Sequence, residues 1–161
     1  MAMATSTGLE AFDRTIHHAN AWLSDLTAEL GEDRRMAYRM LRAFLHLLRD
    51  RLTIEEGAHL AAQLPHLWRG VFYEGWVPSR TPDRLRDRES FLERFAVEAQ
   101  LTGATEASIG AEACARVLRA HIDEGEFRHI LGLLPSGLLP LFGGERPARE
   151  VPRRDGSEPR G

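Results

Sequence analysis

A chain of 161 residues is long enough to bury a substantial apolar core and short enough to form a single domain. Its net charge of −3 gives no overall attraction to nucleic acid or to an anionic membrane surface, so neither is an expected partner. One cysteine excludes an intramolecular disulfide, and neither a signal peptide nor a membrane-spanning apolar run is evident, which predicts a soluble cytoplasmic protein.

Apolar residues recur at three- and four-residue steps from the beginning of the chain. This spacing predicts an amphipathic helix over residues 9–30, which Gly31 can end, and a second helix over residues 33–51. The expected apolar stripe of the first helix is Phe12, Ile16, Ala19, Leu23, Leu26 and Leu30.

Two signals mark the next helices. Thr53 and Glu56 have the spacing of a capping box, in which each side chain bonds to the other residue's backbone amide, and this predicts a helix over residues 53–64. Pro65 suits the first turn of a fourth helix over residues 66–74, because its missing N–H needs no partner there.

Residues 77–88 interrupt this pattern with prolines and alternating arginine and aspartate, and we expect a solvated linker. The residues from 144 to 161 lack apolar anchors and are expected to be a disordered tail. Between them, four further helices are predicted: 89–101, 105–121, one from 123, and one from Pro135 to Phe142.

The second half of the chain repeats the first. With Pro65 set against Pro135, an offset of 135 − 65 = 70, residues 41–72 align with 111–142 without a gap. The identical pairs are Ala43/Ala113, Leu48/Leu118, Arg49/Arg119, Glu56/Glu126, His59/His129, Leu64/Leu134, Pro65/Pro135 and Phe72/Phe142. We therefore predict an all-α fold: two tandem four-helix repeats, at about 12–76 and 89–142, packed into one compact bundle and one domain over 9–143.

The repeat duplicates a Glu-x-x-His motif, as Glu56/His59 and Glu126/His129. Two such motifs are half of a carboxylate-bridged dinuclear metal site, which makes these four residues candidate metal ligands. Their position argues against a metal site, because both glutamates lie at N3 of a helix and are expected to cap it. Asp123 replaces Thr53 as the expected cap in the second copy.

An aromatic segment ends the first repeat and has no counterpart in the second. Trp68, Tyr73, Glu74 and Trp76 lie in it, and tryptophan and tyrosine often anchor protein interfaces. These four residues are our candidate partner-binding site. In the alternative interpretation, Trp76 folds back and covers the seam between the repeats.

No motif of a known catalytic or nucleotide-binding site occurs in the chain, so we assign no catalytic residue and no cofactor. Cys114 lies on the apolar stripe of its helix and is expected to be a buried hydrophobe rather than a nucleophile. An enzymatic activity has no positive support in the sequence.

Several segments resemble the bacterial "domain of unknown function 2267" family, over about residues 12–143. They are His59 to Pro65, Leu67, Arg69-Gly70, Tyr73-Glu74-Gly75-Trp76 and Pro78, and, in the second half, Val117-Leu118-Arg119, Gly125-Glu126 and Leu134-Pro135. The resemblance implies a helical bacterial cytosolic protein and brings no activity, cofactor or catalytic residue. The expected function is a non-catalytic module that binds a protein partner or self-associates; the alternative is a bundle that binds a metal or small ligand through the Glu-x-x-His pairs.

Overall fold

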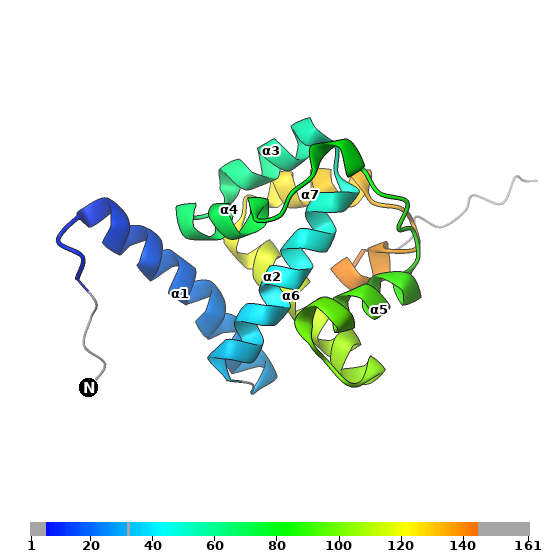
Figure 1. Cartoon of the computed structure of the whole chain (residues 1–161), viewed down its shortest axis with the longest axis horizontal. Helices are drawn as coiled ribbons and strands as arrows, with labels where there is room; N and C mark the ends of the chain where they lie inside the picture. Colours follow the sequence, from blue (N-terminus) through cyan, green and yellow to red (C-terminus); the bar gives the residue numbers. More distant parts are fainter. Residues whose placement is uncertain (1–5, 32, 145–161) are drawn as a thin grey trace, which may run out of the picture.

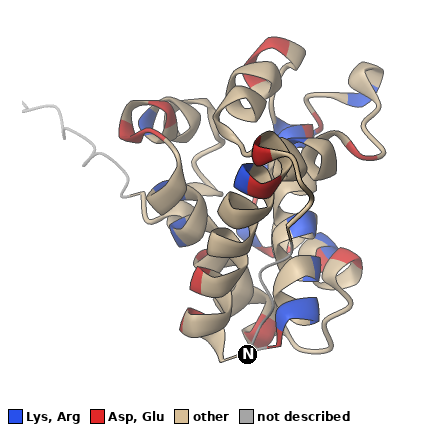
Figure 2. Cartoon of the chain, turned by 90° about the vertical axis from the view of Figure 1, so that its left-hand side faces the viewer, with Lys and Arg blue, Asp and Glu red and all other residues tan. Residues whose placement is uncertain are grey.

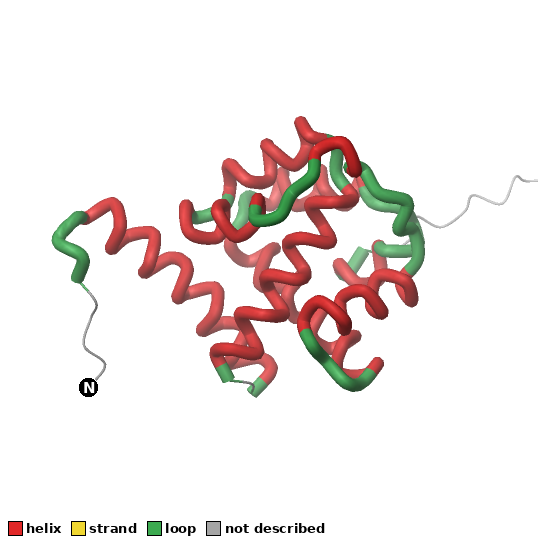
Figure 3. Tube along the Cα trace, in the orientation of Figure 1, coloured by secondary structure: helices red, strands yellow, loops and turns green. Residues whose placement is uncertain are grey.

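The computed structural model describes residues 6–31 and 33–144. Within them the chain forms α-helices and short 3₁₀-helices and no β-strand, which confirms the predicted all-α class (Figure 3). In chain order the elements are α1 (Glu10–Leu30), α2 (Arg34–Arg51), α3 (Ile54–Gln63), α4 (His66–Tyr73), η1 (Pro78–Arg80), α5 (Arg88–Ala99), α6 (Ala104–His121), α7 (Glu124–Leu133) and η2 (Leu139–Phe142). Of the tail predicted over 144–161, residues 145–161 lie outside the described residues.

Side-chain caps determine where most of these helices begin. Asp33, Thr53, Asp87 and Asp123 each accept a hydrogen bond from the backbone amide three residues later, at the starts of α2, α3, α5 and α7. Gly31 ends α1 in the left-handed conformation that favours glycine, as predicted. The helix boundaries are therefore local consequences of the sequence.

Helix α2 crosses the middle of the molecule and packs against α1, α4, α5 and α6 (Figure 1). Its buried residues are mostly apolar, but His46 and Arg49 are buried as well. The buried side chains of all the α-helices join in one hydrophobic core. No helix in the described part of the chain has both the length and the apolar character needed to cross a membrane.

The two halves of the chain interlock. The first helix of each half packs most extensively on the second helix of the other half, α1 on α6 and α5 on α2. Such a reciprocal exchange means that neither half encloses a core of its own. The single domain over residues 9–143 stays a prediction.

The helix boundaries also follow the predicted offset. Helices α2 and α6 each have 18 residues and start 104 − 34 = 70 residues apart, and α3 and α7 each have 10 residues and start 124 − 54 = 70 residues apart. This agreement covers two helices in each half, and the tandem four-helix repeat itself stays a prediction.

The last predicted helix differs from what the structure shows. Residues 135–142 form a turn followed by the 3₁₀-helix η2, not an α-helix from Pro135. Pro140 has no N–H to donate to an α-helical bond, and the backbone of Gly137 lies against the backbone of Arg86. In the first half, Pro65 is the N-cap of α4 rather than its first residue.

Two further segments depart from expectation. Phe12 belongs to the predicted apolar stripe but is 58% exposed, because the N-terminal end of α1 extends beyond the rest of the molecule (Figure 1). The segment 77–88 is tied to α2 rather than fully solvated: the Asp83 amide donates to the Asp50 carbonyl at 2.7 Å, and Arg51 donates to the Asp83 carbonyl.

Candidate functional site

The turn that follows α4 is held in place by α2. Arg49 is 6% exposed, and its Nη1 donates to the carbonyl oxygens of Phe72 and Glu74, both at 2.8 Å. A cation at these carbonyls satisfies acceptors that the end of a helix leaves unpaired. Gly75 then turns the chain with φ +69°, a conformation that glycine adopts without strain.

A second α2 side chain, His46, contacts the last turn of α4. His46 Nε2 lies 2.6 Å from the Val71 carbonyl oxygen, so this nitrogen carries a proton and donates it. Burial, aided by the nearby positive charge of Arg49, lowers the pKa of His46 and favours the neutral ring.

Glu74 forms an ion pair with another side chain of the molecule. Arg42 binds its carboxylate through two nitrogens, Nη2 to Oε1 at 2.8 Å and Nε to Oε2 at 3.2 Å. The hydrogen bond from Arg42 lowers the pKa of Glu74, so the carboxylate stays ionised. This candidate partner-binding residue thus takes part in fixing the turn.

Trp68 lies in the core. It is 2% exposed, its Nε1 donates to the Ala19 carbonyl at 3.2 Å, and its ring lies near those of Trp22 and Tyr38. A partner cannot reach this indole, so Trp68 joins α4 to α1 instead of forming a contact surface. The sequence pattern does not distinguish it from Trp76, because both are tryptophans in the same short segment.

Tyr73 and Trp76 remain partly exposed on the turn. Their ring centroids are 5.3 Å apart, and Val77 beside them is 41% exposed. Several partly buried apolar side chains of the described residues pack against the core. Tyr73 is one of them, and Trp76 is not. We call Tyr73, Trp76 and Val77 the aromatic surface.

The first Glu-x-x-His motif has the predicted capping role. The Thr53 amide donates to Glu56 Oε2 at 2.9 Å, and the Glu56 amide donates to Thr53 Oγ1 at 3.2 Å. His59 is exposed one turn later on α3. The capping box therefore uses the carboxylate that a metal would need.

The second motif keeps only half of this arrangement. Asp123 accepts from the Glu126 amide at 3.2 Å, but the Glu126 carboxylate does not return to the Asp123 amide, and its Oε1 is buried without a hydrogen-bond partner. The expectation that Glu126 shares the capping chemistry of Glu56 is wrong. His129 is exposed, and no group of three His, Cys, Asp or Glu side chains in the described residues has a geometry that could hold a metal ion.

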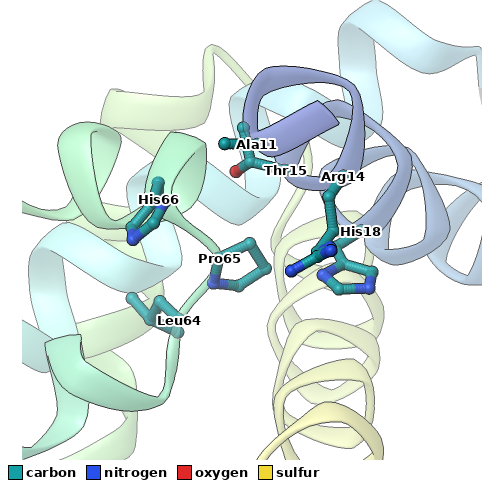
Figure 4. Close-up of a pocket in the computed structure, with 7 residues that line it drawn as sticks. All are labelled: Ala11, Arg14, Thr15, His18, Leu64, Pro65 and His66. Carbon is teal, nitrogen blue, oxygen red and sulfur yellow. The ribbon is translucent and has the colours of Figure 1, made fainter. Parts of the chain in front are cut away.

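A groove that the sequence did not reveal runs over the α3–α4 junction at Leu64–Pro65. It consists of two adjoining hollows of about 160 and 400 Å³ that share His18, Leu64 and Pro65. Figure 4 shows Arg14 and His18 of α1 on one side of Pro65 and His66 on the other. The other lining residues are Ala11, Thr15, Ala21, Trp22, Gln63 and His121. We call it the histidine groove.

The imidazole of His121 is oriented at one end of this groove. Its Nε2 lies 2.6 Å from Asp25 Oδ2, and its ring stacks on Trp22 with centroids 5.0 Å apart. His18, His66 and His121 come from three separate helices, so no sequence spacing brings them together. Only the packing of α1 against both α4 and α6 does so.

Comparison with known proteins assigns the chain to a family. The family model described as "Uncharacterized conserved protein (DUF2267)" matches residues 19–141, more than half of the chain, and the chain belongs to this family. None of the curated proteins matches the chain significantly. The matched region includes the aromatic surface and most of the histidine groove, and it begins within α1, after Arg14 and His18.

Proposed function

We propose that this member of the DUF2267 family is a non-catalytic protein-interaction module that binds its partner through the aromatic surface. The observation that supports this most is the contrast among the three tryptophans. Trp22 and Trp68 are each 2% exposed, whereas Trp76 is partly exposed and packs on Tyr73 outside the core. Amphipathic aromatic residues at the surface are the side chains that most often dominate binding energy.

The support beneath this surface favours binding. His46 and Arg49 bind backbone carbonyls of the segment 71–74, and Arg42 binds the Glu74 carboxylate, so the backbone that carries the aromatic pair is held in place before a partner arrives. Immobilising a flexible side chain on binding costs roughly 0.5–1.5 kcal/mol, and a preformed surface avoids much of that cost.

Among the described residues the aromatic surface occurs once. At the offset of 70 residues, Tyr73 corresponds to Gly143, which ends η2 and has no side chain to offer. A partner would therefore bind one face of the molecule, with one contact site per chain. Acidic and basic residues are interspersed along the helices (Figure 2). We therefore expect apolar and aromatic contact to supply most of the affinity for the partner.

Replacing Trp76 with alanine tests this function. We expect the Trp76→Ala protein to keep its helical circular dichroism spectrum and to lose the larger assembly that the wild type forms in extract of its native host, measured by size-exclusion chromatography. The matched control is Trp68→Ala, which removes a buried indole and should lower stability by about 3–5 kcal/mol. If Trp76→Ala unfolds like Trp68→Ala, Trp76 covers the core and the proposal is wrong.

Self-association is one form of this function. If purified wild-type protein alone forms the assembly, sedimentation velocity will show a concentration-dependent species that Trp76→Ala lacks. If it remains monomeric at all concentrations, the partner is a different protein. We place the interaction in the bacterial cytoplasm, because the single cysteine is buried and unpaired and the chain carries no disulfide.

The metal-binding alternative stays a prediction with a simple test. Elemental analysis of protein purified from its host, with Glu56→Gln and Glu126→Gln variants beside it, would detect near-stoichiometric iron, manganese or zinc. The capping role of Glu56 and the exposure of His59 and His129 favour a structural interpretation of these motifs.

A further inference from the structure

The histidine groove gathers protonatable side chains. Three of the seven histidines in the chain line it, together with Arg14. Among the described residues, no aspartate or glutamate lines either hollow, although the protein carries 24 acidic residues and a net negative charge. Three other hollows are lined by acidic as well as basic residues.

Arg14, Thr15 and Gln63 each offer a hydrogen-bond donor to the groove. The Arg14 side chain is 64% exposed, so its guanidinium keeps donors free beyond the one that it gives to Glu10 at 2.7 Å. Thr15 Oγ1 accepts from the Leu67 amide at 3.0 Å, which leaves its hydroxyl hydrogen free to donate. Gln63 contributes an amide group.

Two carboxylates near the groove pair with side chains that line it. Glu10 pairs with Arg14 and Asp25 pairs with His121, each through a single contact. Both carboxylates are themselves largely exposed and are not lining residues. Asp25 occupies Nε2 of His121, so only Nδ1 of that ring is left to face a ligand, and Nδ1 donates only when both ring nitrogens carry a proton.

We propose that the histidine groove binds a small anion bearing phosphate or carboxylate groups. The smaller hollow, lined by Arg14, His18 and His66, has room for one such group, and the larger hollow, with His121, has room for the rest of the ligand. Charge-assisted hydrogen bonds from guanidinium and imidazole groups would hold it. This site is separate from the aromatic surface and does not depend on the proposed interaction function.

Titration of the full-length protein with inorganic phosphate tests the site. Imidazole ¹H–¹³C NMR signals report on all seven histidines, and potassium chloride at equal ionic strength and pH serves as the reference. We expect the signals of His18, His66 and His121 to move together and saturate with one dissociation constant. His59 and His129, which are exposed outside the groove, are internal controls and should not respond.

Variants of the groove sharpen the result. Arg14→Gln and His66→Gln should each weaken phosphate binding by about fivefold to tenfold, because each removes a charged or protonatable donor. His59→Gln, at an exposed position on α3, should leave it unchanged. A parallel titration with citrate distinguishes a carboxylate ligand from a phosphate ligand by which probe binds more tightly.

Three results would overturn the proposal. The first is a set of shifts that appears equally at all seven histidines or grows without saturation, since this is an ionic-strength effect. The second is the absence of any response to both phosphate and citrate. The third is a loss of binding in His59→Gln to the same extent as in Arg14→Gln.

Discussion

Replacement of Arg49 by methionine probes the contact between α2 and the turn after α4. Methionine keeps an apolar side chain of similar length but lacks the guanidinium that donates to the carbonyls of Phe72 and Glu74. A hydrogen bond from a charged donor contributes about 1.5–3 kcal/mol, and the side chain is buried. We expect the free energy of unfolding to fall by about 3–5 kcal/mol.

Urea unfolding followed by far-ultraviolet circular dichroism measures this loss. For a domain of this size the change corresponds to a decrease in Tm on the order of 10 °C. Arg49→Lys should lie between the wild type and Arg49→Met, because a single ammonium group cannot reproduce the planar fork of the guanidinium.

The repeat provides a matched control. Arg119 occupies the position 70 residues after Arg49, but its side chain is 49% exposed and it pairs with Glu124 at the surface. Arg119→Met should therefore leave the Tm nearly unchanged. Equal losses in the two variants would refute the argument that Arg49 stabilises the fold by capping α4.

Three further results are expected. Burial lowers the pKa of His46 below its usual 6.5, so the unfolded chain takes up a proton first and the free energy of unfolding falls as the pH drops below about 6.5. Urea unfolding at pH 7.5 and 5.5 should show a smaller fall in the His46→Gln variant than in the wild type, and an equal fall would contradict this. Gly137→Ala places a Cβ 2.4 Å from the Arg86 carbonyl oxygen and should cost about 1–3 kcal/mol by thermal unfolding, whereas Gly132→Ala meets no neighbour within 4 Å and should not destabilise the protein. Burial raises the pKa of Cys114, so a thiol reagent at pH 8 should label it only after denaturant is added, and rapid labelling of the native protein would contradict this.

Local signals made most of the helices predictable. The Thr53–Glu56 capping box and the Gly31 terminus appear in the structure as the sequence indicates. Such features depend on residues a few positions apart, so the sequence contains all the information that they need.

Features that depend on packing between distant segments were not predictable. Phe12 continues the apolar stripe of α1, yet the helix extends beyond its neighbours there and the side chain is exposed. Glu126 has the position of a capping residue, but its carboxylate does not bond to the Asp123 amide, and one carboxylate oxygen, Oε1, is buried without a hydrogen-bond partner. Gly137 packs against the end of the linker, and no local rule predicts that approach.

The candidate partner-binding site stays a prediction. The structure shows that Tyr73 and Trp76 of the predicted segment form a partly exposed pair. The sequence did not show that Trp68 is buried against Ala19, because that contact spans 49 residues. The histidines of the histidine groove come from three helices, and the sequence did not predict the groove for the same reason.

The most direct test of the proposed interaction is a photo-crosslinking residue placed at Val77 in living host cells. Val77 is 41% exposed and adjoins Trp76, while Val97, which is 78% exposed on α5, is the matched control position. We predict one defined crosslinked product from position 77 that disappears when Trp76→Ala is added, and no such product from position 97. The same products from both positions, or a product from position 77 that survives Trp76→Ala, would contradict the proposed interaction site.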